Sequence, residues 1–94
     1  MRRAAKVDSN QKQIVKQLRE LGISVAPGHD DLLVGYQGKT YWFELKDPAK
    51  LLCADGVTFR KGVILESQEK IRRTWRGHYA IVWELEMILY NIGF

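Results

Sequence analysis

Residues 31–47 read DLLVGYQGKTYWFELKD, and this stretch decides the fold. It contains two apolar-rich runs of strand length, residues 31–36 and 39–46. The Gln37-Gly38 pair between them suits a tight two-residue hairpin turn. The stretch therefore predicts a β-hairpin, and the positions of its charged residues can be read from its register.

This hairpin places two acids face to face. With a two-residue loop, counting back from the turn puts Asp31 directly opposite Glu44, with Cβ atoms roughly 5 Å apart. A four-residue loop keeps this register, whereas a three-residue loop or a bulge would shift it. Opposed carboxylates repel each other, and a divalent cation between them turns that cost into a binding site. Oxygen-only ligands favour Mg²⁺ or Mn²⁺ over zinc.

The second strand adds an amine to the two acids. Glu44 and Lys46 are two residues apart, so they project from the same face, whereas Phe43 and Leu45 project from the opposite face into a core. A metal ion held by the acids would polarise a phosphate and activate a water molecule. Lys46 could orient that water or neutralise charge in the transition state. The pattern predicts a phosphodiesterase, with Trp42 near the site on the same face.

The sequence on either side of the hairpin adds helices and another strand. A helix is expected from about residue 9 to residue 21, with Leu18 and Leu21 on its buried stripe and Gly22 as its stop. Residues 49–65 show no clear period and are expected to form a long connection with one short element. The other predicted elements are strands at 23–26 and 79–83 and helices at 67–76, with Trp75 turned inward, and 84–92. The order αβββαβα predicts an α/β fold with a mixed sheet flanked by helices.

Composition sets broad limits on function. The 94 residues suffice for one domain, and burial of further surface in a homodimer would help to stabilise it. Lys and Arg exceed Asp and Glu by 15 to 11, which fits a nucleic-acid partner without requiring one. The single cysteine, Cys53, suits a reducing cytoplasm, and no apolar run reaches membrane-spanning length. Residues 1–8 are expected to be a flexible basic arm.

Two segments carry a resemblance to a known family. Residues 28–35 (GHDDLLVG) followed by residues 41–47 (YWFELKD) resemble the core of the PD-(D/E)XK nucleases, which have a restriction-endonuclease-like fold. With the opening DSNQ at 8–11, Ser67-Gln68 and the closing strand and helix, the chain closely resembles a stand-alone VRR-NUC domain of the phage or bacterial type, over residues 8–92. The resemblance implies a homodimeric Mg²⁺- or Mn²⁺-dependent DNA endonuclease, similar to Holliday junction resolvases and selective for four-way junctions.

The resemblance also implies roles for individual residues. Asp31 and Glu44 would be metal ligands, with the carbonyl of Leu45 as a third, and Lys46 would be the catalytic lysine. Gln68 would orient that lysine or contact the phosphate backbone, and Gln11 occupies a position where related nucleases often have a glutamate. The chain departs from the pattern twice. Gln11 is neutral and so a poorer ligand, and His29-Asp30 precedes Asp31 where the family name leads one to expect a proline.

Several residues keep alternative interpretations. Gln11 could complete a helix capping box with Asp8 instead of serving the site, and Gln68 could be an ordinary polar residue in the first turn of its helix. His29 lies opposite Lys46 in the predicted register and could contact phosphate. The basic residues expected to contact DNA with it are Arg2, Arg3, Lys61 and Arg72. Two rival functions remain open: a DNA-binding module with little or no catalytic activity, and a nuclease subunit of a larger complex.

Overall fold

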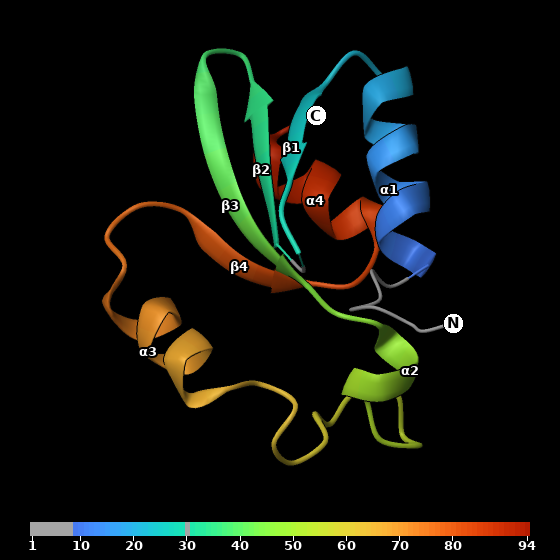
Figure 1. Cartoon of the computed structure of the whole chain (residues 1–94), viewed down its shortest axis with the longest axis vertical. Coiled ribbons are helices and arrows are strands. Elements are labelled where there is room, and N and C mark those ends of the chain that lie inside the picture. Colours follow the sequence, from blue (N-terminus) through green and yellow to red (C-terminus); the bar gives the residue numbers. More distant parts are fainter. Residues whose placement is uncertain (1–8, 30) are drawn as a thin grey trace.

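The computed structural model describes residues 9–29 and 31–94. The predicted order of elements is confirmed, and the short element expected in the long connection is a helix, α2, which begins at Pro48 (Figure 1). The elements are α1 (Ser9–Glu20), β1 (Ser24–Pro27), β2 (Asp31–Tyr36), β3 (Lys39–Leu45), α2 (Pro48–Leu51), α3 (Glu66–Thr74), β4 (Tyr79–Val82) and α4 (Leu85–Ile92).

The four strands form one mixed sheet in the order β1-β2-β3-β4. The β1–β2 and β2–β3 pairs are antiparallel, and β4 runs parallel to β3. In the β2–β3 ladder Tyr36 pairs with Lys39 and Asp31 pairs with Glu44, so the predicted register is confirmed. Gln37 and Gly38 form the two-residue turn, with φ values of 53° and 80°. Both residues are left-handed, which matches the right-handed twist of the strands.

Helices α1 and α4 cover one face of the sheet, where the core lies (Figure 1). The alternation of β2 and β3 sends Leu32, Val34, Phe43 and Leu45 to this face, where they are almost completely buried. Ile14, Val15 and Leu18 of α1 pack onto them, because their spacing puts them on one stripe of the helix. Asp31, Trp42 and Glu44 necessarily project from the other face, over which α3 lies.

The connection between β3 and α3 is more ordered locally than its sequence suggests. Asp47 caps α2 by accepting a hydrogen bond from the Ala49 amide (2.9 Å), and Pro48 occupies the first helical position. After α2 the chain folds back on itself at an isolated bridge between Leu52 and Phe59. This connection brings the chain to the far face of the sheet, where α3 begins.

Two predicted core positions are wrong. Leu21 is 44% exposed because α1 ends at Glu20, so that Leu21 already belongs to the turn that leads to Gly22. Trp75 is 52% exposed because α3 ends at Thr74 and Trp75 is its extended C-cap. The Trp75 ring instead lies edge-on to Trp42, at a centroid distance of 5.1 Å.

Among residues 9–29 and 31–94, none of the helices is long and apolar enough to cross a membrane.

The turn conformation yields a stability prediction. Replacing Gly38 with alanine should lower the free energy of unfolding by about 1–2 kcal/mol, because a Cβ atom disfavours the left-handed backbone. A Cβ atom at this position would have no heavy atom within 4 Å, so the effect would come from the backbone alone. Gln37→Asn, which suits the same conformation, should instead raise stability slightly. Urea unfolding measures both changes, and equal midpoints for wild type and Gly38→Ala would contradict the assignment of the turn.

Candidate functional site

The candidate site is centred on Glu44, a buried acid in a central strand. Glu44 is 5% exposed, although it projects from the sheet face opposite the core. The Nε2 of Gln68 donates a hydrogen bond of 2.8 Å to Oε2 of Glu44, and the Lys46 ammonium lies 3.6 Å from the same oxygen. Removing a charged group from water is costly unless it is paired, so these contacts explain how a carboxylate is retained there.

Gln68 connects α3 to the site through both ends of its amide. Its Oε1 accepts a hydrogen bond of 3.0 Å from the Leu65 amide at the start of α3, while its Nε2 donates to Glu44. Only this orientation of the amide matches an N–H donor at one end and a carboxylate acceptor at the other. Gln68 is 8% exposed, so α3 is fixed over the open face by this residue. Gln68 thus bonds both to the start of its own helix and to Glu44, while its predicted role in orienting Lys46 or contacting phosphate stays a prediction.

Asp31 is oriented from two sides. The indole N–H of Trp42 donates a hydrogen bond of 3.2 Å to Oδ2 of Asp31. Gly28 lies against the other carboxylate oxygen, so closely that a Cβ atom on Gly28 would overlap Oδ1. The Gly28 amide also donates to the Asp31 carbonyl at 2.8 Å. The Asp31 carboxylate thus lies in a cradle formed at Gly28, where any residue other than glycine would clash with it.

Gln11 supports this connection and does not face the acids through any hydrogen bond that the structure describes. Its side chain is 4% exposed, and its Nε2 donates to the Gly28 carbonyl at 3.1 Å. The alternative capping partner, Asp8, lies outside the described residues. One residue earlier, Asn10 donates to the Lys46 carbonyl at 3.1 Å. Helix α1 therefore contacts both chain segments that carry the candidate site.

The residues that meet at the site fit a hard divalent cation. Asp31 and Glu44 contribute two negative charges and Lys46 one positive charge, so the group carries a net charge of −1. Its ligands are carboxylate oxygens from a directly paired position, the type that Mg²⁺ and Mn²⁺ prefer. Within the described part of the chain, no three His, Cys, Asp or Glu side chains gather at metal-binding distance. The Leu45 carbonyl could add a further ligand from the backbone, while the Leu45 side chain lies in the core.

Of the residues predicted to contact DNA, the three that the structure describes do not join this group. The paired register starts at Asp31, so His29 is an exposed residue of the connection and the predicted pairing with Lys46 is wrong. Lys61 is exposed in the loop before α3. Arg72 is exposed on α3 and forms an ion pair of 2.6 Å with Glu69, which offsets its charge. Arg2 and Arg3 lie outside the described residues.

The contacts of Trp42 and Asn10 are the part of the site that sequence reasoning missed. Trp42 is expected near the site because it lies two residues before Glu44, but its hydrogen bond to Asp31 depends on a side-chain rotamer. Asn10 has no signal in the sequence beyond its place beside Gln11.

The chain matches no protein-family model, and no curated protein or solved structure is significantly similar to it.

The cradle at Gly28 yields a test of the site. Gly28→Ala should displace the Asp31 carboxylate and weaken Mn²⁺ binding by about 10–100-fold, the range seen when groups that orient metal ligands are changed. The control is Gly35→Ala in β2, where a Cβ atom would lie 3.4 Å from the Ser24 side chain, an ordinary contact. Titration calorimetry with Mn²⁺ measures both variants. Equal affinities for Gly28→Ala and wild type would show that Asp31 takes no part in binding the ion.

Proposed function

We propose that this protein is a metal-dependent endonuclease that hydrolyses phosphodiester bonds in DNA, and that it is a PD-(D/E)XK nuclease of the VRR-NUC type. One observation carries the proposal: Asp31 pairs directly with Glu44 across β2 and β3, and the Lys46 ammonium lies 3.6 Å from Glu44. Metal-dependent phosphodiester hydrolysis needs acids to hold the ion and a cation to stabilise the phosphate, and this sheet face offers two acids and one lysine. The resemblance to nucleases with a restriction-endonuclease-like core implies the same three residue types on a sheet.

Each residue has a role that follows from its contacts. Asp31 and Glu44 would hold Mg²⁺ or Mn²⁺, which supplies positive charge to stabilise the phosphate as it is attacked. The Lys46 ammonium lies 3.6 Å from Oε2 of Glu44, which is longer than a direct hydrogen bond, and an ammonium has three donors. It can therefore donate to a phosphate oxygen and stabilise the charge that develops there. Trp42 and Gln68 position Asp31 and Glu44 respectively.

The proposal includes a substrate, a four-way DNA junction, and an assembly, a homodimer. A four-way junction carries two strands to be cut symmetrically, and a homodimer would present one site to each strand. The excess of basic over acidic residues supports a polyanionic partner, and the resemblance to junction resolvases supports this substrate.

A second candidate function, DNA binding without turnover, has one specific observation in its favour. Gln11 stands where related nucleases often place an acid, and its amide is engaged with the Gly28 carbonyl. If Gln11 contributes no acid, the acidic ligands proposed here are Asp31 and Glu44 alone. Mn²⁺ binding without any cutting would favour this function over the nuclease.

The decisive experiment combines three variants with one assay. Asp31→Asn and Glu44→Gln preserve shape but remove a charge, and each should abolish both Mn²⁺ binding and cutting of labelled DNA. Lys46→Met should keep Mn²⁺ binding and lower the cutting rate by about 10²–10³-fold, the usual effect of removing one group that stabilises the transition state. The matched control is Glu86→Gln on α4, an exposed acid on the covered side of the sheet.

The assay uses junction, flap and linear duplex DNA of the same sequence, with Mg²⁺, Mn²⁺ or EDTA. We expect cutting only with a metal, with the junction cut fastest, and a dimer by sedimentation equilibrium. Equal cutting of junction and linear DNA would contradict the substrate preference alone. Undiminished cutting by Asp31→Asn or Glu44→Gln would contradict the nuclease site itself.

A further inference from the structure

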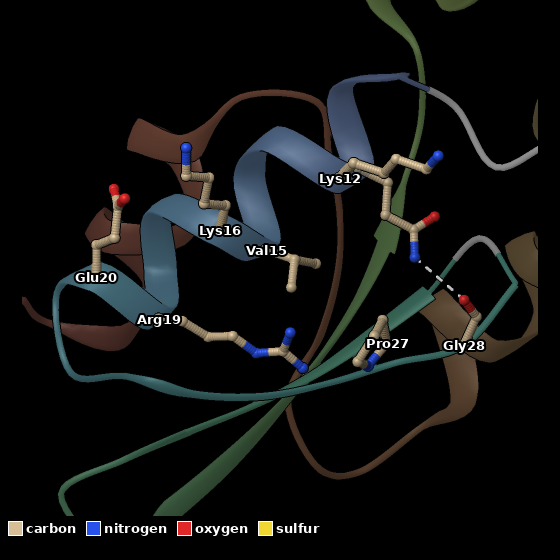
Figure 2. A pocket seen from close by; sticks show the side chains of 8 residues that line it. Lys12, Val15, Lys16, Arg19, Glu20, Pro27 and Gly28 are labelled. Atoms are coloured by element: carbon tan, nitrogen blue, oxygen red, sulfur yellow. Dashed lines mark hydrogen bonds between the residues drawn. The ribbon is translucent and has the colours of Figure 1, made fainter.

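A groove lies between α1 and the end of β1. Its volume is about 610 Å³, and it extends from Glu20 at one end of α1 to Gly28 beyond β1. Figure 2 shows Val15 and Arg19 reaching from α1 toward Pro27, with the Gln11–Gly28 hydrogen bond closing one end. Because β1 is the edge strand of the sheet, no further strand covers this side of it.

The helix side of the groove is strongly basic. Lys12, Lys16 and Arg19 recur at the i, i+4 and i+7 positions of α1, so they lie along one face of the helix, and all three are exposed. Glu20 is the one acid among the lining residues. Arg19 makes one long hydrogen bond, 3.4 Å, to the Val25 carbonyl, which leaves most of its donors for a ligand. The described residues that line the groove therefore carry three positive charges against one negative charge, which suits an anion.

The spacing of these cations suits a chain of phosphates. At 1.5 Å per residue, Lys12 and Arg19 are about 10 Å apart along the axis of α1. Neighbouring phosphates of one DNA strand lie farther apart than the rise of about 3.4 Å per phosphate along the duplex axis, so this distance, with the reach of the long Lys and Arg side chains, suits contact with neighbouring phosphates of one strand. The apolar floor formed by Val15 and Pro27 can pack against deoxyribose. No aromatic residue lines the groove, so it has no platform on which an unpaired base could stack.

Gly28 borders both the groove and the candidate site. The carbonyl of Gly28 accepts the Gln11 hydrogen bond at the end of the groove, and the Cα atom of Gly28 lies against the Asp31 carboxylate. A strand lying in the groove would therefore pass close to the Asp31 carboxylate at Gly28.

We propose that the α1–β1 groove binds the sugar-phosphate backbone of one strand of a duplex arm next to the phosphate that is cut. Lys12, Lys16 and Arg19 contact successive phosphates, and the bases remain paired and face away from the protein. The groove reads no sequence, because cations and an apolar floor recognise only the backbone. This inference rests on the proposed nuclease function for the position of the cut, and it identifies which surface holds the substrate.

The test measures DNA binding without cutting. Wild type and variants are titrated in EDTA against a short fluorescent duplex, over a series of salt concentrations. Lys12→Gln/Lys16→Gln should weaken binding about tenfold or more at low salt and reduce the slope of log affinity against log salt by about 2, since each phosphate contact contributes about 0.9. Glutamine keeps the helix propensity of lysine, and thermal unfolding checks that the variants are folded.

Matched controls separate a local effect from net charge. Lys16→Gln is compared with Lys39→Gln, an exposed lysine at the hairpin turn, and Glu20→Gln with Glu86→Gln on α4. We expect Lys16→Gln to weaken binding several-fold more than Lys39→Gln, and Glu20→Gln to strengthen it more than Glu86→Gln. Equal effects within each pair would overturn the groove proposal, as would displacement of the duplex by polyglutamate at equal charge concentration.

Cutting assays with the same variants keep the two proposals distinguishable. Groove-dependent binding in a protein that never cuts DNA would support the groove and remove the nuclease function. Normal cutting by a protein whose groove variants bind and cut like wild type would leave the nuclease and remove the groove.

Discussion

The structure of the site depends on the register of the β2–β3 hairpin, which holds two like charges directly opposite each other. A directly opposed pair has Cβ atoms about 5 Å apart, and two like charges at that distance would repel by about 3 kcal/mol at an effective dielectric constant of about 20. A natural sheet tolerates that cost only where neighbouring groups offset it. Here the Trp42 indole donates to Asp31, and Lys46 and Gln68 share one oxygen of Glu44. Hydrogen bonds to charged groups each contribute about 1.5–3 kcal/mol, enough together to hold the pair in place.

The helices around the sheet pack on two different faces and contribute differently to the site. Helices α1 and α4 bury the apolar face and fix the twist and position of β2 and β3. On the open face, α3 is held over Glu44 by Gln68 and leaves Trp75 exposed beside Trp42. Helix α1 also contacts the site from the core side, because its first turn bonds to the Gly28 and Lys46 carbonyls. The acids are thus supported by elements from both layers.

Contacts between residues close in sequence could be predicted from the sequence, whereas contacts between separate elements could not. The Asp31–Glu44 pairing could be predicted because the Gln37-Gly38 turn fixes the register locally and side chains alternate along a strand. The roles of Gln11 and Trp42 could not, because their hydrogen bonds depend on where separate elements pack and on which rotamers that packing selects. The basic face of α1 is visible in the spacing of its lysines. That this face lines a groove could not be predicted, because the groove forms only where edge strand β1 packs beside α1.

The central claim is that Asp31 and Glu44 together hold one divalent ion. A crystal of the protein grown with Mn²⁺ tests it directly, because anomalous scattering locates manganese independently of any assumed site. We expect a single strong anomalous peak between the two carboxylates, within about 2–2.3 Å of an oxygen of each, as hard divalent ions are coordinated. Carboxylates that keep their paired positions with no manganese between them, or manganese bound elsewhere on the chain, would contradict this account.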